Sequence, residues 1–446
     1  MKTKSIDLTT GSPGRGLLWF ALPLILGNLF QQFYNMVDTI IVGKYVGEEA
    51  LAAVGASYAL TTVFVMIAIG GGTGASVVIS QYLGARENEN MKTAIHTALL
   101  AFLGTSIVLG LLGIVANQWI LLALKTPENI LGDAALYLRI YFLGLPFLFM
   151  YNILAAIFNA LGDSKTSLYF LIFSSVLNIF LDLFTVKVLY WGVAGVAIAT
   201  VTAQGIAMVL SLVVLMKRLK TYEGEAEKFS LPILKKMVKV AIPSIIQQSI
   251  VSVGMLLVQS VVNGFGSAVL AGYTAGMRLE SICIVPMISM GNAVSTFAAQ
   301  NMGAGKVERV RRGYRISYGI VVVFAVIICA VLLLGREPLI RMFLEEDAGG
   351  AAFETGVSYL SFIAYFFVFI GLKASTDGVL RGAGDVVVFT AANLVNLGIR
   401  VSFAFLMAPV IGVQAVWMAV PIGWAVNYLI SGVRYLTGQW SRKKLV

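Results

Sequence analysis

Charged residues are scarce in this chain of 446 residues. Aspartate, glutamate, lysine and arginine together make up 12% of it, whereas soluble domains carry about 25%. Hydrophobic residues account for 59%, so a soluble fold of this composition could not cover itself with polar surface. The scarcity of charge therefore excludes an ordinary soluble protein and predicts a chain embedded in a bilayer.

Histidine and cysteine are nearly absent. The one histidine, His96, excludes a histidine-based metal cluster or catalytic triad. The two cysteines, Cys283 and Cys329, lie in apolar stretches and are expected to be packing residues. The glycine-lysine stretch 303–306 lacks the first glycine of a nucleotide-binding loop and is followed by Val307. We therefore predict that the chain is not an enzyme and uses neither ATP nor a cofactor.

Long apolar runs recur along the whole chain. A run of about 20 residues crosses the ~30 Å hydrocarbon layer as a helix, because backbone groups in lipid must be paired within the segment. The sequence predicts an all-α integral membrane protein of twelve transmembrane helices. They are expected at 17–42, 51–82, 93–117, 133–160, 165–187, 193–216, 238–262, 268–302, 313–334, 354–380, 387–408 and 413–436. The glycine cluster 70–74 lies inside one run and is interpreted as a close helix contact.

Lysine and arginine are distributed unevenly between the two sides. The termini and even-numbered loops hold 22 of the 32, the odd-numbered loops five and the spans five. This bias places both termini in the cytoplasm. We interpret the net charge of +10 as a topology signal and expect no nucleic-acid partner. The first apolar run is too long for a signal-peptide core, so no cleaved leader is expected.

The two halves of the chain resemble each other at an offset of 219 to 222 residues. The matching segments are 21–25 with 241–245, 80–85 with 299–304, 159–163 with 381–385, and 192–195 with 412–415. Halves with an even number of spans are parallel repeats, as in transporters whose two bundles flank a central pathway. We predict two six-helix bundles, residues 1–216 and 238–446, joined by a cytoplasmic linker at 217–237.

Two prolines occupy matching positions in the first helix of each half. Pro23 and Pro243 each remove a backbone donor and bend the helix. The functional interpretation is a bend that changes during transport, and a fixed kink is the alternative.

Carboxylates inside a bilayer are expensive and are functional candidates by default. In the first half Asp38 and Asp182 fall near the outer ends of their helices, and Asn178 shares a helix face with Asp182. The candidate coupling cluster consists of Asp38, Tyr137, Asn178, Asp182, Thr200 and Thr202. Oxygen ligands from Asp38, Asn178, Asp182 and Thr200 would suit Na⁺. The two carboxyl groups could instead share a proton, and structural hydrogen bonding is a third interpretation.

The second half carries different charges. Val258, Arg400 and Ala404 stand at the positions that match Asp38, Asn178 and Asp182, so the acidic cluster exists in one half only. Lys373 and Asp377 lie one helical turn apart and could neutralise each other. Glu280 could pair with Arg278 or Arg400, or it could attract cationic substrates. The candidates for the substrate cavity are Arg278, Glu280, Asp377 and Arg400.

These features resemble the multidrug and toxic compound extrusion (MATE) family. The resemblance rests on Pro23 with Asp38, on the Gln-x-x-Gly-Ala loops ending at residues 85 and 304, and on the Gly-Asp loops at 162–163 and 384–385. It implies a secondary antiporter that exports amphipathic, often cationic compounds in exchange for Na⁺ or H⁺. It also implies an ion site at Asp38, Asn178, Asp182 and Thr200, with Tyr137 as a weaker match.

A flippase for lipid-linked precursors, from the same wider superfamily, is the alternative function. Its pyrophosphate cargo would favour Arg278 and Arg400, whereas the pair Asp38 and Asp182 weighs against it. We expect a monomer in a prokaryotic inner membrane, with small-molecule substrates and the lipid bilayer as its partners.

Overall fold

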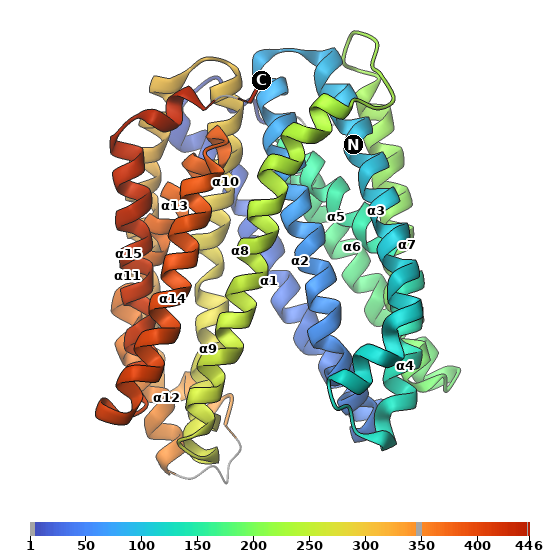
Figure 1. The fold of residues 1–446 in the computed structure, drawn as a ribbon, viewed down its shortest axis with the longest axis vertical. Helices are drawn as coiled ribbons and strands as arrows, with labels where there is room; N and C mark the ends of the chain where they lie inside the picture. Colours follow the sequence, from blue (N-terminus) through green and yellow to red (C-terminus); the bar gives the residue numbers. More distant parts are fainter. Residues whose placement is uncertain (1–4, 345–349, 444) are drawn as a thin grey trace. The chain divides into compact units, whose positions relative to one another are not determined.

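The computed structural model describes residues 5–344, 350–443 and 445–446, and at 59, 250, 251, 253, 255 and 256 the backbone alone (Figure 1). Within these residues the chain is helical and contains no β-strand. The helices are α1 (Pro13–Tyr45), α2 (Glu48–Ala85), α3 (Asn88–Ala123), α4 (Glu128–Leu143), α5 (Leu145–Ala160), α6 (Ser164–Leu183), α7 (Gly192–Leu219), α8 (Leu231–Asn263), α9 (Ser267–Cys283), α10 (Val285–Gly303), α11 (Val307–Arg341), α12 (Gly350–Ile363), α13 (Phe367–Ala383), α14 (Val386–Ile411) and α15 (Gln414–Leu436). The all-α prediction is confirmed.

Each predicted span has a helix, or two consecutive helices, at its place. Ten helices of the described chain are long and apolar enough to cross a membrane, or eleven if the bent pair α4 and α5 forms one span. That pair is bent by 52° at Gly144, because Pro146 has no N–H to continue the helical hydrogen bonds. The predicted span 238–262 coincides with α8, several of whose side chains lie outside the described residues.

The chain divides into two compact units. Unit 1 contains Leu26–Ile245 and the segment ending at Ile6, and unit 2 contains Asp7–Ile25 and Ile246–Val446. The division crosses α1 and α8 shortly after Pro23 and Pro243. It differs from the predicted boundaries because the start of each of these helices packs with helices of the opposite half.

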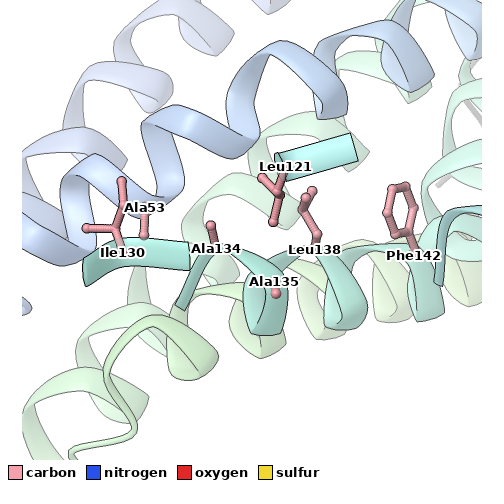
Figure 2. Packing of buried hydrophobic residues seen from close by; sticks show 7 residues of the cluster. All are labelled: Ala53, Leu121, Ile130, Ala134, Ala135, Leu138 and Phe142. Carbon is pink, nitrogen blue, oxygen red and sulfur yellow. The ribbon is translucent and has the colours of Figure 1, made fainter. Parts of the chain in front are cut away.

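A buried apolar cluster holds α2, α3 and α4 of unit 1 together (Figure 2). Ile130, Ala134 and Leu138 recur at every fourth residue of α4; Ile130 lies beside Ala53 of α2, and Leu138 lies beside Leu121 of α3. Phe142 ends this face and meets the ring of Phe64 edge-on, with centroids 5.1 Å apart. The cluster fixes the orientation of α4, the helix that also carries Tyr137.

Small residues let helices approach closely in both units. In unit 1, a Cβ at Gly74 of α2 would lie 2.5 Å from the carbonyl oxygen of Met237 in α8. In unit 2, a Cβ at Gly378 of α13 would lie 2.4 Å from the carbonyl oxygen of Gly291 in α10. Glycines at such places permit backbone-to-backbone packing of membrane helices. The interpretation of the cluster 70–74 as a helix contact is confirmed.

The repeat reappears as a corner built the same way in each unit. Gly162 and Gly384 both take a positive φ, 77° and 87°, which favours glycine. The aspartate that follows each glycine forms a buried ion pair: Asp163 with Arg218 at the end of α7, and Asp385 with Arg434 at the end of α15, 2.6 Å. The two halves therefore share local structure at this corner.

The segments that precede α1 and α8 are also held by hydrogen bonds. In unit 1, the N–H of Glu227 donates to Thr93 Oγ1 of α3 at 3.1 Å. In unit 2, the Leu8 carbonyl accepts from Asn301 of α10 at 3.1 Å and from Arg309 of α11 at 3.2 Å. These contacts anchor the first turns of both helices.

Candidate functional site

Asp38 and Asp182 come together in unit 1. Their carboxyl groups, from α1 and the end of α6, lie within hydrogen-bonding range of each other. Asp182 is fully buried and Asp38 is partly buried. A π-helical turn, Phe184–Val188, follows directly on α6, and such turns are frequent at functional sites. The predicted meeting of the two carboxyl groups is therefore present in the structure.

No donor among the described residues satisfies these carboxyl groups fully. Both side-chain oxygens of Asp182 and Oδ1 of Asp38 are buried without a hydrogen bond from a protein donor. Ionised carboxylates are acceptors only, so two of them in contact cannot satisfy each other. A proton or a small cation between them would remove the repulsion and supply the missing partner.

A chain of hydrogen bonds borders the pair and joins three helices. The hydroxyl of Tyr34 in α1 donates to Asn178 Oδ1 in α6, and the Asn178 amide donates to Thr200 Oγ1 in α7 at 3.4 Å. Thr200 in turn donates to the Val196 carbonyl at 3.1 Å. This chain fixes the orientation of Asn178, which lies one turn before Asp182.

The predicted cluster is assembled except for one member. Tyr137 lies close enough to Asp38 and Asp182 for direct electrostatic interaction and packs against a buried cluster of valines. Thr202 is exposed, because two further residues along α7 turn its side chain away from that of Thr200. Tyr34 was not predicted, although its place four residues before Asp38 on one helix face could have indicated it.

The site suits a monovalent ion better than a transition metal. Its atoms are carboxylate, amide and hydroxyl oxygens, which suit hard cations. Over the described residues, no group of three or more histidine, cysteine, aspartate or glutamate side chains could hold a metal ion. Asp38, Asn178, Asp182 and Thr200 are therefore the residues that would hold Na⁺, and the contacting carboxyl groups alone could hold a proton.

Glu280 forms a second acidic centre, in unit 2. Its carboxylate accepts a hydrogen bond from Tyr359 of α12, whose ring packs on Tyr273 at 5.2 Å and on Trp417 at 5.8 Å. Arg400 lies within electrostatic range, but Glu280 takes part in none of the ion pairs between described residues. The charge of Glu280 is thus set beside a cluster of aromatic rings.

Arg278 does not join the Glu280 centre, because its side chain is exposed.

A third centre contains Asp377, which forms an ion pair with Lys373 at 3.2 Å within α13. The interpretation that these two charges neutralise each other is confirmed. Two further partners of Asp377 were not predicted: Ser431 donates to Oδ1 at 2.6 Å and Asn393 donates to Oδ2 at 3.3 Å.

Comparison with known proteins agrees with the two-half organisation. A family model described as MatE matches residues 23–184 and 243–406, two segments that begin at Pro23 and at Pro243. The chain is 31% identical to the "Probable multidrug resistance protein YpnP" of Bacillus subtilis (strain 168), over 99% of each chain. It is 23% identical to the "Probable multidrug resistance protein NorM" of Thermotoga maritima, over 96% of this chain and 94% of that protein.

Two solved structures share the fold across nearly the whole chain. One is an outward-facing conformation of a multidrug resistance MATE family transporter, with a TM-score of 0.90 and 24% identity over 99% of this chain and 100% of that chain. The other is a MATE protein in the straight conformation, with a TM-score of 0.89 and 23% identity over 99% of this chain and 100% of that chain. The prediction of twelve transmembrane helices in two bundles is thereby confirmed.

Proposed function

Since the chain belongs to the MATE family of multidrug efflux transporters, we propose that it exports amphipathic, often cationic organic compounds in exchange for Na⁺ or H⁺. In this proposal Asp38 and Asp182 hold the coupling ion, with Asn178, Thr200 and Tyr137 around them. The protein works as a monomer in a prokaryotic inner membrane, with both termini in the cytoplasm.

One observation carries the coupling proposal. Three carboxylate oxygens of Asp38 and Asp182 are buried without a donor, although buried carboxylates are ordinarily hydrogen-bonded or paired. No lysine or arginine among the described residues forms an ion pair with either of them. A coupling ion bound between Asp38 and Asp182 supplies the missing partner for these oxygens, and its release during transport leaves them without a partner again.

Direct contact between the two carboxyl groups favours a proton as the ion. Two ionised carboxylates at this range repel strongly in a medium of low dielectric, and one shared proton relieves the repulsion without moving either helix. A sodium ion would need the two groups to separate and would recruit Asn178 and Thr200 as further oxygen ligands.

Glu280 is the proposed attractor for cationic substrates. Its carboxylate accepts from Tyr359, whose ring packs on those of Tyr273 and Trp417, and aromatic faces beside a carboxylate attract organic cations. Arg400, which lies within electrostatic range of Glu280, is assigned to the same site. Asp377, a cavity candidate from the sequence, has a smaller role, because it lies in a separate centre and three protein partners already occupy its carboxylate. The alternative, a flippase for lipid-linked precursors, is not favoured, since the curated relatives above are named for multidrug resistance.

Ethidium uptake into everted vesicles, which corresponds to efflux from the cell, tests coupling. With an imposed proton gradient or, separately, a sodium gradient, Asp38→Asn and Asp182→Asn are expected to abolish gradient-driven efflux. Asp133→Asn is the matched control, because Asp133 is an exposed aspartate of α4 in the same unit. Near-normal gradient-driven efflux by both site variants would remove the proposal, and the gradient that drives the wild type identifies the ion.

Substrate recognition is tested separately with a panel of cationic and neutral compounds of similar size. Glu280→Gln is expected to raise the KM for cations while leaving the KM for neutral compounds unchanged, and Glu354→Gln, at an exposed site of α12, is the control. Unchanged KM for every cation would exclude Glu280 from cation recognition.

Helix bending is tested with Pro23→Ala and Pro243→Ala, which slow efflux if the bends change during transport and leave it unaltered if the kinks are fixed.

A further inference from the structure

The carboxyl pair Asp38 and Asp182 of unit 1 and the carboxylate of Asp377 in unit 2 differ in how their charge is balanced. In unit 1, Asp38 and Asp182 have orphaned oxygens and no basic partner among the described residues. In unit 2, both oxygens of Asp377 are occupied, and one of them lies 3.2 Å from the ammonium nitrogen of Lys373. The contrast separates a carboxylate pair that lacks a counter-charge from a carboxylate that carries its own.

The surroundings of Asp377 have the chemistry of a cation site. Besides its carboxylate, they contain Ser431 Oγ, bonded to Oδ1 at 2.6 Å, and Asn427 Oδ1, which accepts from Ser431 at 3.5 Å. Asp377 is 4% exposed, and Ser431 and Asn427 are fully buried. Hard oxygen atoms gathered around one negative charge are the ligands that alkali cations take.

The cation paired with Asp377 is Lys373, whose ammonium nitrogen lies 3.2 Å from Oδ2, and Arg381 lies within electrostatic range of the same carboxylate. The Lys373 side chain is 11% exposed, and Asp377 is its only ion-pair partner among the described residues. An ammonium group carries the single positive charge of an alkali ion at the end of a flexible stem. Because Lys373 and Asp377 share a helix face one turn apart, the covalent chain holds this charge at the site permanently.

The first half has neither member of the pair. At the offset of 222 that matches Asn159 with Arg381, Tyr151 stands opposite Lys373 and Ala155 stands opposite Asp377. Neither charge is therefore needed for the scaffold that the two halves share. The ion pair is a feature of the second half alone, where the contact of α10 with α13 at Gly378 adjoins it.

We propose that Lys373 is a tethered cation, which fills an alkali-cation site built around Asp377, Ser431 and Asn427 and keeps bath cations out of unit 2. Asp377 then takes up no cation from the bath while Lys373 is in place. Removing the ammonium group while keeping Asp377 exposes a site for Na⁺, Li⁺ or a small organic ammonium ion. The inference concerns cation binding and does not depend on the efflux proposal.

The test measures cation-dependent stability of the full-length protein in nanodiscs. All variants carry Asp38→Asn and Asp182→Asn, which remove the carboxylates of unit 1, and thermal unfolding is followed by tryptophan fluorescence in choline buffer. Adding Lys373→Ala is expected to create stabilisation by NaCl, LiCl and n-propylammonium chloride. The half-maximal Na⁺ concentration should be at least tenfold lower than in the Lys373→Ala/Asp377→Asn combination. Lys239→Ala, at an exposed lysine of α8, should leave the background unchanged.

Two results would overturn the inference. One is a cation response of Lys373→Ala that Asp377→Asn does not weaken. The other is a Na⁺ response in the background with Lys373 intact that disappears when Asp377→Asn is added. Lys373→Met, which keeps the length of the side chain, replaces Lys373→Ala if the alanine variant does not fold. Both results leave the efflux assays of Asp38→Asn and Asp182→Asn unaffected, so the two proposals fail separately.

Discussion

The contact between α10 and α13 gives a prediction that can be worked from distances. An ideal Cβ at Gly378 would lie 2.4 Å from the Gly291 carbonyl oxygen and 3.3 Å from the Ser295 nitrogen. Ordinary contacts of a Cβ begin at 3.4 Å, so Gly378→Ala requires the two helices to separate by about 1 Å. Both obstructing atoms belong to the backbone of α10, and no side-chain rotation relieves the clash.

The expected cost of Gly378→Ala is about 1–3 kcal/mol of unfolding free energy, the usual penalty for overpacking. Gly319→Ala in α11 is the matched control, because a Cβ there meets nothing within 4 Å. Alanine is the better helix former by up to about 1 kcal/mol, so the control should be neutral or stabilising. Equilibrium unfolding in mixed micelles measures both changes. If Gly378→Ala were as stable as Gly319→Ala, the backbone contact described here would be wrong.

Three further predictions concern the corner, the N-terminal segment and the core. Asp385→Asn and Arg434→Gln should each lower the unfolding free energy by about 3–5 kcal/mol, because breaking a buried ion pair leaves one charge without its partner. The double variant should lose less than the sum of the two single losses. Strictly additive losses in the same unfolding assay would contradict this. Burial opposes ionisation of Asp7, but hydrogen bonds from Thr9 outweigh it and hold the pKa of that carboxyl below its usual value. The stabilisation is therefore present at neutral pH and lost as the pH falls through the lowered pKa. Amide-exchange protection factors at residues 8–11 should fall with acid in the wild type but not in Asp7→Asn. Leu138→Ala should cost about 2–5 kcal/mol because the side chain is fully buried between α2, α3 and α4, whereas Leu136→Ala, 44% exposed, should change little.

The span positions followed from sequence because length and hydropathy alone determine whether a segment can cross lipid. The depth of each side chain in the bilayer could also be predicted from the sequence, because it is counted in residues from the end of its helix. That count brought Asp38, Asp182 and Asn178 to one level, and the structure places them together. Depth along the axis was thus sufficient to nominate the centre of the candidate site.

Rotation about the helix axis was harder to predict. Thr202 shares the depth of Thr200, but two residues of α7 turn it outward, so it is exposed. Tyr34 faces Asn178 only because of the rotation of α1, which depends on contacts between helices distant in sequence. The partners of Asp377, Ser431 and Asn393, likewise come from other helices, and no local pattern indicates them.

The grouping of the helix starts could not be predicted from the repeat. The polar stretch 217–237 is an obvious boundary in sequence, and the two halves align on either side of it. The start of α8 nevertheless packs with unit 1, where Ala241 and Met237 lie against Gly74. This packing depends on small residues in α2, which are uninformative until a partner helix is known.

The structure also separates what the two halves share from what distinguishes them. The Gly-Asp corners and the helix order are common to both units, so they serve folding. The charged residues that differ between the halves are not needed for the fold that both halves share. In unit 1 the difference leaves two carboxyl groups without a fixed counter-charge among the described residues, and in unit 2 it adds a carboxylate together with its own ammonium group. A carboxyl pair without a fixed counter-charge is open to a proton or a cation, whereas Asp377 and Lys373 already balance each other. In the proposed ion exchange, the coupling carboxyl groups are therefore the pair Asp38 and Asp182 of unit 1, whereas Asp377 of unit 2 keeps the fixed counter-charge of Lys373.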